Sequence, residues 1–554
     1  MLAFFATGPT LAQPSDPSAS LTEKVDAVFA EWDSTRSPGC ALAVMKEGEI
    51  VYKRAYGMAN LDHDVPLAVD SVFHVASVSK QFTAAAVLLL AQEGKLSLDD
   101  PVQKHLARVP DLGHEITLRH LLHHSSGMRD QWSLLGLAGW RYSRDLITDE
   151  DVMSLISRQK RLNFPPGERY LYCNTGYTLL GQVVKEVSGQ SLREFTKARI
   201  FEPLGMHRTH FRDDFTEIVK SQATGYRRDR AHATFRVSVT NFETVGATSL
   251  LTTVEDLARW DRNFYRPLVG GEHFLEQMHL RGVLNSGRDQ TYASGLVHGT
   301  YKGLGTVSHG GADAGYRAHF LRFPEQRFSL ACLCNLAQTN PASLARQVAD
   351  IYLEKELQTK EPEPAAKKAT PEVRLGQGEL SRLSGTYWSD DRGAAVQIRG
   401  QDGKLMFQLS RSRVYAMIPV GGGRFEVSEL DLSARFEPRG GNPVRRLIVW
   451  SEDEEEESLQ RLDPFEVSPE KLKEFEGAYS SPEIEPIFRI EAGEKNLILH
   501  RLKSEPDELR PIAKDVFLGR IGHLRFERDA DGTITGFLLD AGRIRNFGFQ
   551  KRKE

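Results

Sequence analysis

The chain has 554 residues, 40% of them hydrophobic and 26% charged, and its formal net charge at pH 7 is −4. This length predicts several domains, each able to bury its own apolar core. Because there is no basic excess, nucleic-acid partners are not expected, and because no run of 18 apolar residues occurs, neither is a transmembrane segment.

The first 20 residues read MLAFFATGPTLAQPSDPSAS, a short apolar run followed by small residues and a stretch rich in proline and serine. They resemble the end of a secretory signal, although the positively charged beginning of such a signal is missing. Residues 1–20 are therefore expected to be a remnant signal or a disordered tail. The expected location is periplasmic or secreted if the signal is real, and cytoplasmic otherwise.

The cysteines are too few and too scattered to predict a disulfide framework. They are Cys40, Cys173, Cys332 and Cys334. The last two lie in FSLACLCN, which has the pattern of a buried strand. Because no second cysteine or histidine pair accompanies them, they are interpreted as inert buried thiols. The cysteines therefore leave the cellular compartment open.

Residues 40–58 alternate apolar and polar positions around Gly48, which predicts a β-hairpin. From about 75 to 95 the apolar positions predict a largely buried helix that ends at a glycine. The span from 116 to about 265 is mostly helical in pattern, with turns at glycine and proline. Strand patterns return in YASGLVHG, VSHGG, AHFLRF and FSLACLCN. Strands at both ends with helices between them predict one α/β domain, residues 21–358, whose sheet combines distant segments.

Residues 359–376 form the expected inter-domain linker, because the stretch QTKEPEPAAKKATPE, which begins at Gln358, is almost free of bulky apolar residues. An internal repeat follows: LSRLSGTYWS, from Leu380, matches LKEFEGAYSS, which begins 92 residues later. Each copy is a series of short alternating segments with Gly, Asp and Asn turns, which predicts two small antiparallel β-barrels. Their expected ranges are 377–465 and 466–554. Neither copy shows a constellation of nucleophile, base or metal ligands.

The spacing S-x-x-K occurs at Ser77, Ser157 and Ser468. A serine hydroxyl becomes nucleophilic only when a base accepts its proton, and a lysine one helical turn away can be that base. Ser77 precedes an apolar helix, so the helix N-terminus and the desolvated surroundings favour this chemistry with Lys80. The other two serines lie in polar, surface-like contexts. Ser77 and Lys80 are therefore the candidate nucleophile and base.

Two later triplets are suited to the same reaction. The segment YCN, with Tyr172 and Asn174, follows a Pro-Gly turn; a tyrosine can transfer a proton, and an asparagine can hold a substrate amide. His309, Gly310 and Gly311 lie in a predicted strand, where glycines let an acyl substrate lie along the strand edge and the imidazole supplies a donor or a positive charge. Each triplet alone is weak evidence, since a buried tyrosine and a loop histidine are the alternative interpretations.

In this order, S-x-x-K, Y-x-N and H-x-G resemble the motifs of the serine β-lactamase and penicillin-binding-protein superfamily, in particular its class C, esterase and D-aminopeptidase branch. The resemblance covers roughly residues 25 to 355 and includes the linking segments ITLRHLLHHSSGM, FPPGERYLYCNTGYTLLG and TSLLTTVEDLARW. It implies a five-stranded antiparallel sheet flanked by helices, an all-helical subdomain and a covalent acyl-enzyme. Such a domain followed by two lipocalin-like barrels resembles the bacterial D-aminopeptidases, in which a barrel loop can contact the substrate.

Carried over by position, the resemblance makes Ser77 the acylated nucleophile and Lys80 its proton acceptor. Tyr172 is then the partner base that protonates the leaving group. The implied substrate contacts are Asn174, His309, Gly310 and Gly311, and the backbone N–H groups of Ser77 and Ala312 would form the oxyanion hole. His309 stands where many β-lactamases have lysine, which favours peptide or ester hydrolysis over efficient lactam turnover.

The sequence thus predicts a serine hydrolase of small peptide, amide or ester substrates, D-amino acid peptides among them, with β-lactams as ligands to be tested. No metal or cofactor is expected: His120 and His124 have zinc-ligand spacing, but no H-E-x-x-H pattern accompanies them. The alternatives are a penicillin-binding sensor, a non-catalytic scaffold that presents the barrels, and a weak β-lactamase or esterase. Whether the chain forms homo-oligomers stays open.

Overall fold

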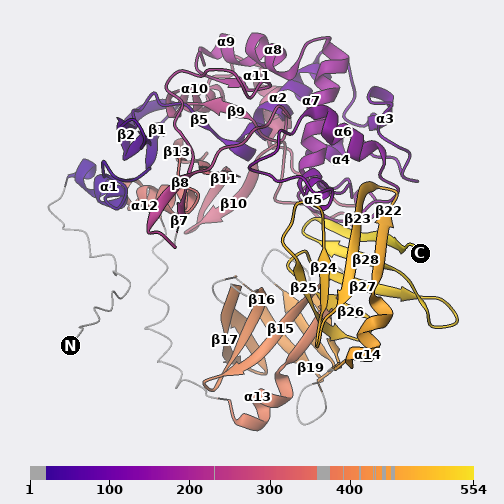
Figure 1. Cartoon of the computed structure of the whole chain (residues 1–554). Coiled ribbons are helices and arrows are strands. Elements are labelled where there is room, and N and C mark those ends of the chain that lie inside the picture. The colour runs from indigo at the N-terminus through magenta and orange to yellow at the C-terminus, as the bar shows by residue number, and fades with distance from the viewer. Residues whose placement is uncertain are drawn as a thin grey trace. The chain divides into compact units, whose positions relative to one another are not determined.

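The computed structural model describes residues 20–229, 231–357, 375–390, 392–410, 413–427, 430, 432–438, 444–450, 456–463 and 465–553 (Figure 1). The chain divides into two compact units, which are described separately. The first comprises Met1–Ser97, Leu180–Gly282 and Asp289–Lys360, and the second comprises Leu98–Leu179, Val283–Arg288 and Glu361–Glu554. Nearly all of the expected signal remnant (1–20) and of the expected linker (359–376) lies outside the described residues.

The central sheet of the first unit has six antiparallel strands in the order β10-β11-β12-β13-β1-β2 (Figure 1). Their bounds are β1 (Cys40–Lys46), β2 (Glu49–Tyr56), β10 (Val297–Tyr301), β11 (Leu304–Asp313), β12 (Tyr316–Phe323) and β13 (Phe328–Cys334). The predicted hairpin is confirmed as β1 and β2, joined by Glu47 and Gly48, both with positive φ, as tight hairpin turns require. The sheet does combine distant segments, but β10 makes it one strand larger than the resemblance implies.

Helices surround this sheet. Those of the first unit are α1 (Leu21–Phe29), η1 (Ala76–Ser79), α2 (Lys80–Gln92), α8 (Leu192–Thr196), η2 (Lys197–Phe201), α9 (Glu202–Leu204), α10 (Val254–Asn263), α11 (Gly271–His279) and α12 (Pro341–Tyr352). Short strands accompany them: β3 (Met58–Asn60), β4 (Val65–Pro66), β5 (Phe73–His74), β6 (His210–Phe211), β7 (Tyr226–Asp229), β8 (Thr234–Val237) and β9 (Leu250–Thr252). The predicted buried helix is therefore a 3-10 turn, η1, that continues into α2.

Opposite faces of the sheet are covered by different helices. Helices α1 and α12 pack on the face that carries Leu330, and together they form a continuous apolar core. Helix α10 lies on the other face, where Asp261 accepts hydrogen bonds from Arg322 and Ser329. Because Ser329 and Leu330 are neighbours in β13, their side chains point to opposite faces.

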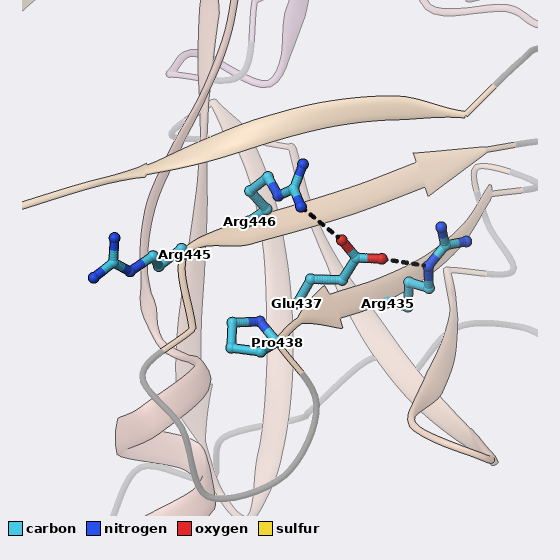
Figure 2. Close-up of a pocket in the computed structure, with 5 residues that line it drawn as sticks. All are labelled: Arg435, Glu437, Pro438, Arg445 and Arg446. Carbon is cyan, nitrogen blue, oxygen red and sulfur yellow. Dashed lines mark hydrogen bonds and ion pairs between the residues drawn. The ribbon is translucent and has the colours of Figure 1, made fainter.

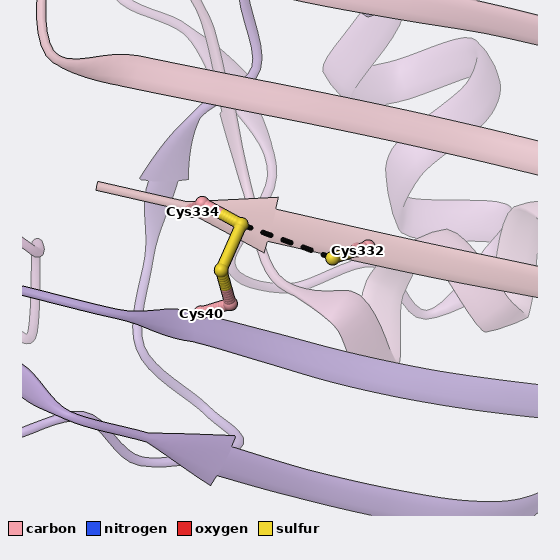
Figure 3. A group of neighbouring side chains, drawn as sticks. All are labelled: Cys40, Cys332 and Cys334. Carbon is pink, nitrogen blue, oxygen red and sulfur yellow. Dashed lines mark hydrogen bonds between the residues drawn. A yellow bond between two sulfur atoms is a disulfide. The ribbon is translucent and has the colours of Figure 1, made fainter. Parts of the chain in front are cut away.

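A disulfide joins the sheet's first and last strands in the sequence. Cys40 on β1 is the direct cross-strand partner of Cys334 on β13, and the two are bonded (Figure 3). Cys332 lies on the same face, with its sulfur 3.8 Å from that of Cys334. Burial raises the pKa of the Cys332 thiol above its usual range. The prediction of inert thiols therefore holds for Cys332 and is wrong for Cys334, whose partner is 294 residues away.

The second unit begins with helices and ends with two barrels. Its helical segment contains α3 (Val102–His105), α4 (Leu118–Leu122), α5 (Gln131–Leu137), α6 (Asp149–Ser157) and the start of α7 (Asn174–Ser188). Side-chain caps fix where these helices begin: Thr117, Asp130 and Thr148 each accept a hydrogen bond from a backbone N–H of the first turn. Nowhere in the described parts of the chain is a helix both long and apolar enough to cross a membrane.

The two predicted barrels are confirmed as closed barrels of eight antiparallel strands in sequence order. The first, preceded by α13 (Gln377–Leu383), consists of β14 (Gly385–Ser389), β15 (Ala394–Gln401), β16 (Lys404–Ser410), β17 (Arg413–Gly421), β18 (Arg424–Val427), β19 (Leu432–Glu437), β20 (Arg446–Trp450) and β21 (Glu457–Leu462). The second, preceded by α14 (Pro469–Leu472) and η5 (Lys473–Phe475), consists of β22 (Gly477–Ser481), β23 (Ile484–Ala492), β24 (Leu497–His500), β25 (Asp507–Ala513), β26 (Val516–Leu518), β27 (His523–Arg528), β28 (Ile534–Ala541) and β29 (Ile544–Lys551).

The internal repeat is visible in atomic detail. The hydroxyl of Tyr387 donates to the carbonyl of Leu383 in the first barrel, and the hydroxyl of Tyr479 donates to the carbonyl of Phe475 in the second. Both tyrosines are fully buried in the apolar interior of their barrels, so each hydroxyl needs this partner. The two copies of the repeat therefore share the same hydrogen bond between the first strand of the barrel and the short helix that precedes it.

Candidate active site

Ser77 and Lys80 lie together at the junction of η1 and α2. Lys80 is fully buried, and its Nζ donates to Ser77 Oγ at 3.1 Å and to the carbonyl of Ala247 at 2.7 Å. The Ser77 side chain is half-buried. One 3-10 turn separates the two residues, so both side chains lie on the same side of the helical segment. The pair therefore has the proximity that proton transfer requires.

The backbone before Ser77 is tightly held. Ala76 has a φ of +49°, which is uncommon for a residue with a side chain, and its carbonyl accepts a hydrogen bond from Ser79 Oγ. Ser79 Oγ also accepts from the N–H of Leu250 at 3.1 Å. A Cβ on Gly311 would lie 2.2 Å from the carbonyl oxygen of Val75. Gly311 is therefore needed for the close approach of β11 to the residues that precede Ser77.

The second half of β11 has a strand neighbour on one side only within the central sheet. The pairing of β10 with β11 ends at Ser308, whereas the pairing with β12 continues to Asp313. Gly310 and Ala312 alternate with buried neighbours and are exposed. This geometry suits an extended substrate that adds to the strand edge, as expected for this triplet.

His309 is buried and uncharged at neutral pH. Its Nδ1 lies 2.7 Å from the carbonyl oxygen of Gly310, and its Nε2 lies 3.0 Å from the hydroxyl of Tyr292. Because a carbonyl oxygen can only accept, Nδ1 carries the proton and Nε2 accepts from Tyr292. Burial, and then the nearby charge of Lys80, lower the pKa of His309 to about 3. The imidazole therefore does not supply the positive charge that a lysine would bring to this position.

Acid should weaken the first unit through His309 and His319. Burial lowers their pKa values to about 3 and about 4, so in the folded state both stay neutral well below the usual pKa of 6.5. Stability is then fully present above about pH 6.5 and falls as the pH drops toward 4, by about 3 kcal/mol per pH unit for the two together. Thermal midpoints measured from pH 7.5 to 4.5 test this.

In that experiment His319→Gln should have a shallower pH dependence than the wild type, by about one proton. The exposed His63 offers a matched control, because His63→Gln should keep the wild-type slope. Equal slopes in all three proteins would contradict the assignment of buried neutral imidazoles.

In the second unit, Asn174 begins helix α7 and is held by a buried carboxylate. The backbone N–H and the side-chain Nδ2 of Asn174 both donate to Asp130 Oδ2 at 2.8 Å. The other carboxylate oxygen, Oδ1, accepts from the N–H of Trp132 and caps α5. Asp130 therefore fixes the orientation of the Asn174 amide relative to two helices.

Tyr172 is packed between a histidine and an arginine. The rings of Tyr172 and His124 have centroids 4.2 Å apart, and the Arg543 guanidinium carbon lies 4.7 Å from the centre of the Tyr172 ring. His124 has a φ of +56°, and its Nδ1 accepts from the N–H of Cys173 at 3.1 Å. Burial raises the pKa of the Cys173 thiol to about 12. The cysteine of the YCN triplet is therefore a neutral packing residue beside the tyrosine.

His120 and His124, which have zinc-ligand spacing, each accept a hydrogen bond from a backbone N–H group. His120 Nδ1 accepts from the N–H of Thr117 and closes a capping box, and His124 is engaged with Cys173 as described. Over the described ranges, the group of side chains close enough together to bind a metal is that of Cys40, Cys332 and Cys334. Two of these three form the disulfide, so they are not thiolate ligands.

The other two S-x-x-K serines have local structural roles. Ser157 Oγ donates to the carbonyl of Ser154 near the end of α6, and Ser468 Oγ accepts from the N–H of Lys471 as the cap of α14. Both hydroxyls are thus engaged with the backbone, and in the part of the chain that the structure describes neither of these hydrogen bonds involves the lysine side chain of its motif. This distinguishes both serines from Ser77.

A pocket in the first barrel is chemically different. Arg435, Glu437, Pro438, Arg445 and Arg446 line it, and the carboxylate of Glu437 lies between the guanidinium groups of Arg435 and Arg446 (Figure 2). No nucleophile is among the lining residues, so this pocket is not a candidate active site.

Several supporting residues were not predicted from the sequence: Asp130, His124, Tyr292 and Arg543. Asp130 stands two residues before a tryptophan in a segment with no motif, and Arg543 lies in a barrel hairpin more than 350 residues from the tyrosine that it contacts. The only local signal is Gly542, which precedes Arg543 and marks a tight turn.

An antiparallel sheet between helices, with a half-buried serine beside a buried lysine, defines a serine hydrolase of the penicillin-recognising type. The model of the Beta-lactamase family matches residues 25–353, and the chain belongs to this family. The superfamily predicted from the three motifs is therefore confirmed, as are the α/β domain and the two barrels.

Curated relatives cover most of the chain. Penicillin-binding protein 4* of Bacillus subtilis (strain 168) is 28% identical over 428 residues, which cover 74% of this chain and 93% of that protein. A D-aminopeptidase of Gluconobacter oxydans (strain 621H) is 25% identical over 477 residues, covering 84% and 83%. Among solved structures, the octameric penicillin-binding protein homologue from Pyrococcus abyssi has a TM-score of 0.56 and 25% identity over 79% of this chain and 98% of that chain.

The D-amino acid amidase from Ochrobactrum anthropi SV3 shares the fold, with a TM-score of 0.51 and 21% identity over 60% of this chain and 99% of that chain. Together these similarities identify the chain as a serine hydrolase of the β-lactamase and D-aminopeptidase type.

Proposed function

We propose that the chain hydrolyses small peptides and amides, D-amino acid derivatives among them, through an acyl-enzyme on Ser77. The observation that carries the proposal is the 3.1 Å contact between Lys80 Nζ and Ser77 Oγ in a chain of this family. The relatives named D-aminopeptidase and D-amino acid amidase support the substrate class. Ester substrates and β-lactams react at the same kind of acyl carbon and serve as probes.

In the proposed reaction, Ser77 Oγ attacks the carbonyl carbon while its proton passes to Lys80 Nζ, which is neutral at that moment. The backbone N–H groups of Ser77 and Ala312 stabilise the negative charge on the carbonyl oxygen. The bond to the leaving nitrogen then breaks as Tyr172 gives that nitrogen a proton, and the proton that Lys80 took from Ser77 returns Tyr172 to its neutral form. Asn174 holds the substrate amide. Water finally adds hydroxide to the acyl carbon and returns a proton to Ser77 Oγ.

The strand motif takes a supporting part in this proposal. Gly310 and Gly311 keep the edge of β11 accessible and close to the residues before Ser77, so an extended substrate can add to the strand. His309 acts as a neutral group that Tyr292 orients, not as a cation for a substrate carboxylate. This favours amide and ester hydrolysis over efficient lactam turnover.

The protein should react covalently with a fluorescent fluorophosphonate, and mass spectrometry should find the label on the peptide that contains Ser77. Ser77→Ala should lose the label, whereas Ser157→Ala, which removes another S-x-x-K serine, should keep it. Turnover of D-amino acid amides, p-nitrophenyl esters and nitrocefin then ranks the substrates. Covalent labelling by fluorescent penicillin without turnover of any of these would instead support a penicillin-binding sensor. Equal labelling of Ser77→Ala would overturn the proposal.

We also propose a periplasmic or secreted location. The Cys40–Cys334 disulfide supports it, because such bonds persist in oxidising compartments and are rare in the cytosol. Alkylation of the protein taken directly from cells, followed by mass spectrometry, should find these two cysteines protected in a periplasmic or culture-fluid fraction.

A further inference from the structure

The turn between β28 and β29 carries an arginine to the YCN triplet. Ala541 pairs with Ile544, so Gly542 and Arg543 form a two-residue turn, with Gly542 at a φ of +56°. The Arg543 guanidinium carbon lies 4.7 Å from the centre of the Tyr172 ring, and Nη1 lies 3.5 Å from Asp130 Oδ2. These residues all belong to the second unit.

The backbone of this turn is fixed from both sides. The N–H of Arg543 donates to Ser133 Oγ at 3.4 Å, and its carbonyl accepts from Asn163 Nδ2 at 3.1 Å. Asn163 Oδ1 in turn accepts from the N–H of Arg545 at 2.8 Å. The buried Arg129 donates to the carbonyls of Arg545 and Asn546, which follow the turn. The turn is therefore preorganised, and its position does not depend on the Arg543 side chain.

The Arg543 guanidinium makes only one long polar contact within the described residues. The contact with Asp130 is long, because Asp130 Oδ2 already accepts two hydrogen bonds from Asn174 at 2.8 Å. Within the described parts of the chain, no other hydrogen bond or ion pair of the guanidinium is seen, and 42% of the side chain is exposed. A guanidinium has five N–H donors in a planar fork that matches a carboxylate. Most of these donors remain available to a ligand.

The positive charge of Arg543 also affects the pKa values of neighbouring side chains. It opposes the rise in pKa that burial causes at Tyr170 and at Cys173, so its positive charge is felt across the YCN segment. A free ammonium group beside such a charge would be repelled, whereas a carboxylate would be attracted.

We propose that Arg543 is a specificity-determining residue that binds a carboxylate on the leaving group of the substrate. The inference rests on the proposed function, in which Tyr172 protonates the leaving nitrogen, since a group beside Tyr172 then belongs to the leaving side. The preferred substrates are peptides whose leaving residue ends in a free carboxylate. Substrates that present a free amine there are disfavoured.

The test compares three substrates with the full-length protein: N-acetyl-D-alanyl-D-alanine, its C-terminal amide, and N-acetyl-D-alanine 2-aminoethylamide, whose leaving group carries a free amine. Arg543→Gln should lower kcat/KM for the carboxylate substrate about 10- to 100-fold, mainly through KM, because a charge-assisted hydrogen-bonded pair is lost. The C-terminal amide should change less than about threefold. Arg543→Lys should keep part of the preference, and Arg543→Glu should reverse it.

Two controls separate the explanations. Arg552→Gln removes an exposed positive charge from the same barrel and should leave kcat/KM unchanged for all three substrates. Fluorophosphonate labelling of Ser77, measured in every variant, shows whether the acylation chemistry is intact, so failure of the carboxylate proposal is distinguishable from failure of the proposed function. An equal loss on the acid and the amide, or a wild-type preference for the amide or the free amine, would overturn the proposal.

Discussion

Lys80→Met should slow acylation of Ser77 by at least about a thousand-fold while leaving the protein folded. The substitution removes the amine that lies 3.1 Å from Ser77 Oγ but keeps a side chain of similar length and volume. Positioned acid–base groups contribute about 10²- to 10⁴-fold, and the members of one catalytic unit fail together. The rates to measure are fluorophosphonate labelling and p-nitrophenyl ester hydrolysis.

The thermal stability of Lys80→Met should not fall together with its activity. The ammonium of Lys80 is fully buried, so its replacement by a thioether removes a desolvated charge, and the thermal midpoint should stay the same or rise. A merely structural lysine would not separate activity from stability in this way.

The next residue in the helix provides the matched control for Lys80. Gln81 is also buried, and its Oε1 accepts from Trp260 Nε1 at 3.1 Å. Gln81→Met should lower the thermal midpoint because it leaves that donor without a partner, yet it should acylate within about tenfold of the wild type. If Ser77 in Lys80→Met is labelled at the wild-type rate, Lys80 is not the proton acceptor for Ser77.

The features that could be predicted from the sequence are those written into neighbouring residues. Ser77 and Lys80 are three residues apart, so the helical pattern around them suffices to bring them together. The barrels were predictable because each copy repeats the same alternation and the same tyrosine, at Tyr387 and Tyr479.

The features that could not be predicted depend on pairings between distant segments. The Cys40–Cys334 disulfide follows from the register between β1 and β13, which no local pattern determines. The contact of Arg543 with Tyr172 likewise depends on how a barrel hairpin packs on the helical segment of the same unit. The fold class and the proposed nucleophile could thus be predicted from local sequence, whereas the residue that we propose selects the substrate is brought to its place by tertiary packing.

The second large effect is expected at a buried ion pair that anchors the second barrel to the helical segment of the same unit. Arg129 Nη1 lies 2.6 Å from Glu483 Oε2, with side-chain exposures of 1% and 7%. Glu483 Oε2 also accepts from the N–H of Lys160 at 2.9 Å, and the Arg129 guanidinium lies 4.8 Å from the centre of the Phe547 ring. Arg129→Met should destabilise the second unit by about 3 to 5 kcal/mol, because it strands a buried carboxylate.

A neighbouring surface pair provides the matched comparison. Arg158 and Glu485 are 2.8 Å apart and join the end of α6 to β23, but their side chains are 31% and 83% exposed. Arg158→Met should cost less than about 1 kcal/mol. The double variant Arg129→Met/Glu483→Gln should be less destabilised than the sum of its two single variants, because no charge is left unpaired.

Hydrogen exchange measures these effects locally, which matters because a chain of several domains need not unfold in one step. In Arg129→Met, amides of α5, α6, β22 and β23 should exchange faster by the equivalent of the predicted free energy, whereas those of β12 and β13 in the first unit should not change. Because Arg129 also holds the carbonyls of Arg545 and Asn546, the same variant should loosen the turn that carries Arg543. Equal exchange in Arg129→Met and Arg158→Met would mean that the buried pair does not anchor the barrel.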